Sequence, residues 1–261
     1  MDSNFIRRVR LSVSSCAAGL LSLLLASHAA AGEPSWREHW PASAQLYADR
    51  MRTLSPAPAP VAVESLFVLA SRAAAELTNP PESDGLSAVE AMNDSTAALA
   101  SELLPGLTLI LGPDQTGAVP CDSFFLDLSL RRGTPVDIAF FRARIATLDP
   151  WGMPLWIEQT WDYGGCTRFG SGAIVDAWAT WDAFARRHPG RYATAVQEDR
   201  DGCERELLKG DCVCGRREDL LLELHEFVRR FPKRPLAPKV LARIRAVERS
   251  AEPVREHCRP G

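Results

Sequence analysis

The chain has 261 residues, of which 46% are apolar and 24% are charged, and its formal net charge is -3. This is the balance of an ordinary globular protein, and it excludes disordered, collagen-like and polytopic membrane proteins. Nucleic-acid and anionic-lipid partners require a concentrated positive field, which neither the net charge nor any long Lys/Arg tract provides. We therefore expect no nucleic-acid partner.

Residues 1–31 have the pattern of a secretory signal peptide. Three arginines lie between residues 7 and 10, an apolar run follows over residues 11–26, and Ala29 to Ala31 supply a small-residue cleavage site. An uncleaved signal anchor is the alternative, but three serines and His28 make this run a poor membrane span. No later stretch approaches the roughly 20 apolar residues of a spanning helix. The sequence thus predicts a periplasmic or secreted protein that is not an integral membrane protein.

Residues 32–60 are predicted to form one helix and a stiff linker. Tyr47, Met51 and Leu54 repeat at helical spacing after Pro41, which suits the first turn of a helix. Residues 55–60 alternate proline with small residues, a composition that favours polyproline II. The linker separates this segment from the residues that follow.

Residues 61–261 are predicted to form a helical domain. Ser87 with Glu90 reads as a capping box, and Thr134 before Pro135 reads as the start of another helix. Residues 107–111 are an apolar run that fits either a strand or a buried helix. The fold class is therefore expected to be all-α, with irregular or repeat-like helical hairpins. Its helices are expected at 61–77, 87–104, 123–132, 134–148, 174–187, 220–231 and 235–247.

Six cysteines remain once Cys16 is assigned to the signal peptide. An even number in an exported chain favours three disulfides, which would staple the C-terminal half. A bridge between Cys212 and Cys214 is disfavoured by the single residue between them. A metal site using Cys203, Cys212, Cys214 and His225 is the alternative, but one C-x-C without a second pair is a poor zinc pattern. We therefore expect neither a metal nor another cofactor. The six cysteines assigned to disulfides are Cys121, Cys166, Cys203, Cys212, Cys214 and Cys258.

Two segments 43 residues apart resemble each other. Residues 184–191 and 227–234 share Phe, two Arg, Pro and a further Arg at equivalent positions, and each reads as a helix, a proline turn and a second helix. With Ala237 and Leu241, the second segment resembles the junctions of tetratricopeptide-like repeats in exported bacterial envelope proteins. The 43-residue spacing and the missing Trp-Leu-Gly-Tyr pattern depart from that family, so independent helix pairs with similar turns remain the alternative.

Five of the seven tryptophans fall between residues 151 and 181, and the segment from 156 to 163 interleaves aromatic with acidic side chains. Glycosidases use two carboxylates around the scissile bond, and aromatic faces stack on sugar rings. Glu158 and Asp162 are therefore the candidate catalytic pair, and Trp156, Trp161 and Tyr163 are the candidate binding residues. The structural alternative is a tryptophan-rich core.

Two hypotheses follow from the sequence. The first is an exported, disulfide-stabilised helical binding or scaffold protein of the bacterial cell envelope, with a protein or a cell-wall glycan as partner. The second is a carbohydrate-active enzyme that uses Glu158 and Asp162.

Overall fold

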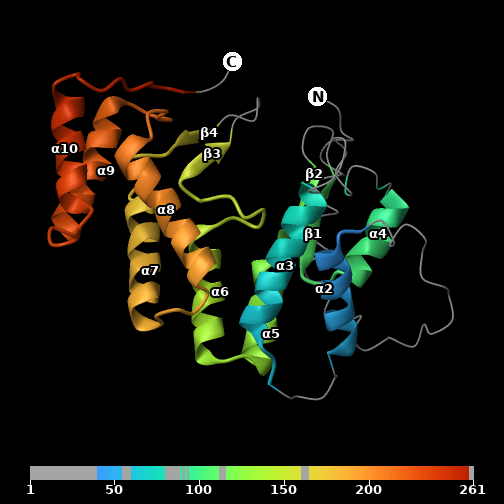
Figure 1. Cartoon of the computed structure of the whole chain (residues 1–261). Helices are drawn as coiled ribbons and strands as arrows, with labels where there is room; N and C mark the ends of the chain where they lie inside the picture. Colours follow the sequence, from blue (N-terminus) through green and yellow to red (C-terminus); the bar gives the residue numbers. More distant parts are fainter. Residues whose placement is uncertain are drawn as a thin grey trace. The chain divides into compact units, whose positions relative to one another are not determined.

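The computed structural model describes residues 40–54, 60–79, 89, 92, 94–111, 116–159 and 165–258. The predicted signal peptide and the Ser87–Glu90 capping box lie outside the described residues. Nine helices and four short strands occur in these described ranges, so the fold is mostly helical rather than all-α (Figure 1). No helix within the same ranges has both the length and the apolar character needed to cross a membrane.

The chain divides into two compact units, which we describe separately. The first contains residues 1–145 with 150–152, and the second contains residues 146–149 with 153–261. The division does not fall at the proline-rich linker, because α2 (Ala42–Thr53) packs against α3 (Val63–Thr78) within the first unit. The remaining elements of the first unit are α4 (Asp94–Leu103), β1 (Leu107–Leu111), β2 (Thr116–Pro120), α5 (Asp122–Arg132) and most of α6 (Pro135–Thr147).

Phenylalanine rings form the core of the first unit. Phe67 of α3 meets Phe125, Phe140 and Phe141 edge to face at centroid distances of 5.2 to 5.4 Å. Such aromatic pairs contribute about 0.5–1.5 kcal/mol each beyond the burial of their area. Arg144 lies over the Phe67 ring and makes a 2.6 Å ion pair with Asp122. These contacts tie α3, α5 and α6 together.

Two local predictions in this unit are settled by the hydrogen bonds. Thr134 begins α6 as predicted, because its Oγ1 accepts from the Asp137 N–H at 3.3 Å and its own N–H donates to Asp137 Oδ2 at 2.7 Å. The apolar run at 107–111 is a strand, which pairs antiparallel with β2 in the register Leu107 to Pro120. Thr78 of α3 anchors this hairpin by accepting from the Ala118 N–H at 2.9 Å.

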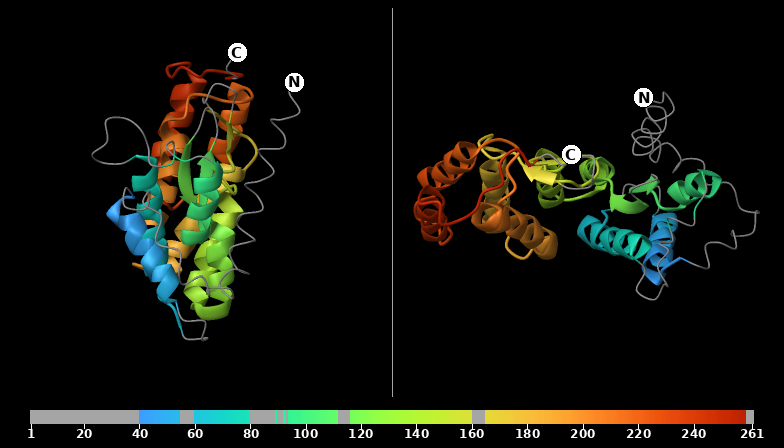
Figure 2. Two further views of the ribbon diagram at one scale, coloured as in Figure 1. Left: turned by 90° about the vertical axis from the view of Figure 1, so that its right-hand side faces the viewer. Right: turned by 90° about the horizontal axis from the view of Figure 1, so that it is seen from above.

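Two antiparallel helical hairpins dominate the second unit (Figures 1 and 2). Helix α7 packs on α8 and α9 packs on α10, while α7 also contacts α9 and α8 also contacts α10. Trp178 of α7 lies 4.9 Å from Phe227 of α9, measured between ring centroids. The four helices are α7 (Ala173–Arg187), α8 (Ala193–Lys209), α9 (Arg217–Arg230) and α10 (Ala237–Glu248).

The two junctions 43 residues apart share two backbone hydrogen bonds but differ in backbone conformation, because the residue before α8, Tyr192, has a φ of +50° and the residue before α10, Leu236, has a φ of -74°. The residue that ends each first helix, His188 or Phe231, donates its N–H to a phenylalanine carbonyl four residues earlier, at 2.9 Å in both cases. Three residues after each of these, the N–H of Arg191 or Arg234 donates back to the same residue's carbonyl at 3.1 Å. The turns are therefore not equivalent along their whole length, and the internal repeat stays a prediction. Membership in a tetratricopeptide-like family stays a prediction.

The C-terminal half carries two disulfides rather than the full set expected. Cys166 bonds to Cys214, and Cys212 bonds to Cys258. Cys203 is free and fully buried, so the prediction that it forms a disulfide is wrong. It shares the buried face of α8 with Val196 and Leu207, where a thiol acts as a small apolar core residue. Cys121 of the first unit, buried just before α5, is disulfide-bonded as predicted.

Candidate functional site

The aromatic and acidic segment singled out by the sequence contains a short hairpin. Strands β3 (Ile157–Gln159) and β4 (Gly165–Thr167) pair antiparallel, and Glu158 stands opposite Cys166. Trp161, Asp162 and Tyr163 lie outside the described residues. Of the candidate catalytic pair, Glu158 is therefore among the described residues and Asp162 is not.

Three of the four described tryptophans of this cluster belong to the interior, whereas Trp151 is half-buried. Trp156 is 2% exposed, Trp178 is 3% exposed and Trp181 is fully buried. Trp178 also donates its indole N–H to Glu204 Oε1 at 3.1 Å. A sugar stacks on an exposed aromatic face, so Trp156 offers no such platform. The concentration of these tryptophans reflects core packing.

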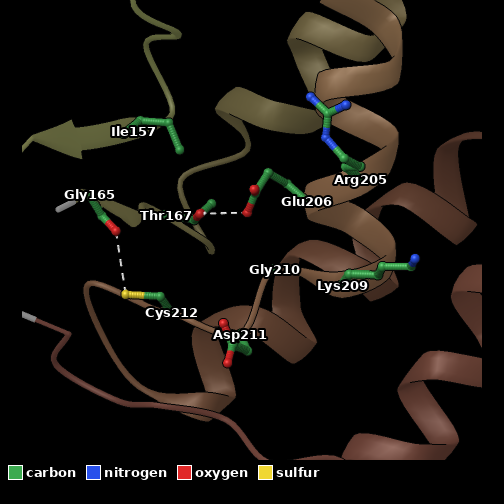
Figure 3. Close-up of a pocket in the computed structure, with 9 residues that line it drawn as sticks. All are labelled: Ile157, Gly165, Thr167, Arg205, Glu206, Lys209, Gly210, Asp211 and Cys212. Atoms are coloured by element: carbon green, nitrogen blue, oxygen red, sulfur yellow. Dashed lines mark hydrogen bonds between the residues drawn. The ribbon is translucent and has the colours of Figure 1, made fainter.

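A cleft of about 250 Å³ opens beside the β3–β4 hairpin (Figure 3). It lies within the second unit, between this hairpin, the C-terminal end of α8 and the residues that follow α8. Its lining residues are Ile157, Gly165, Thr167, Arg205, Glu206, Lys209, Gly210, Asp211 and Cys212.

Backbone hydrogen bonds and disulfides fix one wall of this cleft. Thr167 N–H donates to the Cys212 carbonyl at 2.9 Å, and Cys214 N–H donates back to the Thr167 carbonyl at 3.0 Å. On the other side, Val213 N–H donates to the Arg255 carbonyl at 2.9 Å. The Cys166–Cys214 and Cys212–Cys258 disulfides cross-link the same three segments. Isolated β-bridges and two disulfides thus join these segments to one another.

A buried arginine fixes the helical side of the cleft. The Arg243 side chain of α10 is 3% exposed. It donates to the Glu206 carbonyl at 2.7 Å and to the Gly210 carbonyl at 2.6 Å, and its Nε donates to Glu252 at 2.8 Å. The last carbonyls of a helix have no partners within the helix. Arg243 supplies donors for two carbonyls at the end of α8 and so fixes the turn that follows this helix.

The acidic side chains of the cleft are already engaged. Thr167 Oγ1 donates to Glu206 Oε2 at 2.8 Å, which Figure 3 shows as a link across the cleft. Asp211 pairs with Arg255 at 3.0 Å, and the hydrogen bond from this guanidinium lowers the pKa of Asp211. The cationic side chains, Arg205 and Lys209, are exposed. In Figure 3 Lys209 extends away from Thr167.

The polar side chains that line this cleft have structural partners or face solvent. None of the nine lining residues is a histidine or serine, and Cys212 has no thiol because it is disulfide-bonded. Both carboxylates hold structural partners, and Glu158 does not line the cleft.

The structure does not assemble the metal site that the sequence left as an alternative. Cys203 is buried, whereas Cys212 and Cys214 belong to different disulfides, and His225 lies 3.7 Å from Glu248. Glu158 does lie with Cys166 and Cys214, with ligand-type atoms within 4.8 Å of one another. These two sulfurs are bonded to each other, and zinc requires thiolates, so the group does not fit a metal while oxidised.

Sequence reasoning missed Glu206, Arg243 and the Asp211–Arg255 pair. Arg243 did leave a signal, because it falls within the buried stripe of Val240, Ile244 and Val247 on α10. An arginine in such a stripe is buried only when it is fully hydrogen-bonded. Two of its partners are backbone carbonyls 37 and 33 residues away, which no local pattern identifies.

No protein-family model matches the chain, and no curated protein or solved structure shows significant similarity to it. Its function is therefore inferred from the geometry of its own residues.

Proposed function

We propose that this protein is an exported, disulfide-stabilised helical binding or scaffold protein of the bacterial cell envelope. The observation that carries the proposal is the pair of disulfides, which cross-link β4, residues 212–214 and Cys258 beside the cleft. Disulfides form and persist in oxidising compartments such as the periplasm or the extracellular space. Residues 1–31 also support export, because their basic and apolar segments have the pattern of a signal peptide.

The size of the cleft favours a macromolecular partner. Sites that enclose a small molecule measure about 300–1,000 Å³, and this cleft is smaller, at about 250 Å³. It suits one side chain of a protein or the edge of a cell-wall glycan, with the exposed Arg205 and Lys209 at its rim. The hairpins α7–α8 and α9–α10 provide the rigid support on which such a contact depends.

The proposal is tested by placing a photo-reactive amino acid at Lys209 in cells that export the protein. Lys239 on α10 is the matched control, because it is also an exposed lysine of this unit but does not line the cleft. We expect a discrete adduct with an envelope protein or with peptidoglycan from position 209 and none from position 239. Equal labelling from both positions, or protein retained in the cytoplasm, would contradict the proposal.

The enzyme hypothesis is not proposed further. Trp156 is buried, and the two carboxylates of the cleft, Glu206 and Asp211, are held by Thr167 and Arg255. No described feature therefore favours glycan cleavage over binding.

A further inference from the structure

Acidic residues are missing from one end of the second unit. This end consists of residues 183–197, around the turn between α7 and α8, and residues 227–239, around the turn between α9 and α10. The two segments contain eight of the 30 basic residues of the chain and none of its 33 acidic residues. We call them the basic end. Its basic residues are Arg186, Arg187, Arg191, Arg229, Arg230, Lys233, Arg234 and Lys239.

The fold brings the two basic segments together. Figure 1 shows both turns at the lower ends of their hairpins. Arg234 of the second turn pairs at 2.8 Å with Asp182 of α7, and the same carboxylate also pairs with Arg186. Arg230 at the end of α9 pairs with Asp176 of α7 at 2.5 Å. The segments are 43 residues apart in the sequence, so a concentrated positive field arises only in the folded chain.

The positive charge of the basic end is only partly neutralised. Four of its arginines share three carboxylates, which belong to Asp176, Asp182 and Glu226. Three further cations are exposed and make no ion pair with any residue that the structure describes, namely Arg187, Lys233 and Lys239. These seven cations and three carboxylates leave an excess of four positive charges, although the whole chain has a net charge of -3.

The chemistry of this end suits the phosphate head groups of a membrane. Guanidinium groups bind phosphate oxygens through charge-assisted hydrogen bonds. A bilayer presents many phosphates in one plane, so it can meet the cations of both turns at once. No large apolar side chain is exposed among the described residues of the basic end, so the contact would be made with head groups rather than with acyl chains.

We propose that the basic end docks on the surface of a membrane that contains anionic phospholipids. Each lysine or arginine near such a surface strengthens binding about fivefold. Helix α8 begins at the basic end and ends at the cleft, and its 17 residues span roughly 25 Å. Docking would therefore present the cleft away from the membrane. The inference goes beyond the proposed function and rests on it only for export, which brings the protein to the envelope membranes.

Cosedimentation of the purified, oxidised protein with vesicles at low ionic strength tests the proposal without depending on export. We expect binding to vesicles of equal parts phosphatidylglycerol and phosphatidylcholine, and none to vesicles of phosphatidylcholine alone. Added salt should weaken the binding, because it screens exposed charges. The double substitution Arg187→Gln with Lys233→Gln should weaken it about thirtyfold, since two unpaired cations are lost.

The matched control is Arg245→Gln with Arg249→Gln, which removes the same charge. These exposed arginines lie at the end of α10 that is away from the basic end. We expect the control to bind within about twofold of wild type, because charges beyond a Debye length from the membrane contribute little. Circular dichroism should show both variants folded.

Equal losses in the two double variants would overturn the proposal, as would absence of binding to the anionic vesicles. Tighter binding to a DNA duplex or to an anionic polysaccharide than to these vesicles would also overturn it, and would assign the basic end to a polyanion instead. None of these outcomes bears on the photo-crosslinking at Lys209, because that residue lines the cleft and is not part of the basic end.

Discussion

The carboxylate of Glu223 on α9 lies 2.8 Å from the backbone nitrogen of Gly172, which immediately precedes α7. The same carboxylate accepts from the N–H groups of Gly170 at 2.8 Å and Val175 at 3.2 Å. Gly170 and Gly172 have φ values of +83° and +77°, a conformation that favours glycine. A buried acid of the second hairpin thus caps the first helix of the first hairpin.

Glu223→Gln should lower the free energy of unfolding by about 2 kcal/mol, because an amide cannot accept from all three N–H donors. Burial raises the pKa of Glu223, while the N–H groups act in the opposite direction. The measurement is urea unfolding at neutral pH. Glu226→Gln on the same helix is the control, since that carboxylate is partly exposed, and it should change stability little. Equal losses in the two variants would argue against the capping role.

Arg243→Ala should lower the free energy of unfolding by about 3 kcal/mol, because it leaves two backbone carbonyls and a carboxylate without the donor of this buried side chain. Arg245→Ala, at an exposed position of the same helix, should stay within about 0.5 kcal/mol of wild type. Denaturant unfolding of both variants measures the difference. If Arg243→Ala unfolds like wild type, this side chain does not hold the end of α8.

The Asp211 carboxyl should titrate below its ordinary value of 3.8, because the Arg255 guanidinium stabilises its charged form. A pKa lowered in the folded state adds stability above the unfolded value, and this stability is lost as the pH falls through the folded pKa. Carbon-detected NMR titration of the side chain measures the shift. Arg255→Gln should return the pKa toward 3.8, while Arg245→Gln should leave it unchanged. A wild-type Asp211 that already titrates at its ordinary value would contradict the pairing.

Cys203 should resist thiol reagents in the native protein and react fully after unfolding. The side chain is buried, and burial raises its pKa, so the reactive thiolate is scarce. Labelling with a maleimide before and after addition of denaturant, followed by mass spectrometry, tests this. Rapid labelling of the native protein at Cys203 would show that α8 does not pack as described.

Local sequence patterns predicted the helices that have capping residues or a regular apolar stripe. Thr134 and Pro135 mark the start of α6, and the apolar spacing of 174, 178 and 181 marks the buried face of α7. Helix α8 was not predicted, because most of its residues are polar and Gly202 interrupts it. Only Val196, Cys203 and Leu207 are buried on this helix, which is too few to give a clear apolar stripe in the sequence.

The site was predictable only in part, since its contacts join residues distant in sequence. The C-x-C pattern correctly indicated that Cys212 and Cys214 reach two different partners, but spacing alone could not name Cys258 or Cys166. Trp156 was predicted to bind a ligand, but it is buried. A tryptophan-rich segment by itself does not show which of its side chains are exposed. The cleft itself depends on the end of α8, which the sequence did not predict to be helical.

Peptide mapping of the protein recovered from exporting bacterial cells, alkylated before lysis, tests the proposed export and stapling most directly. We predict that the envelope or secreted fraction contains linked peptides for Cys166–Cys214 and Cys212–Cys258, with Cys203 recovered as a free thiol. Recovery of Cys166, Cys212, Cys214 and Cys258 as alkylated thiols, in a protein confined to the cytoplasm, would contradict it.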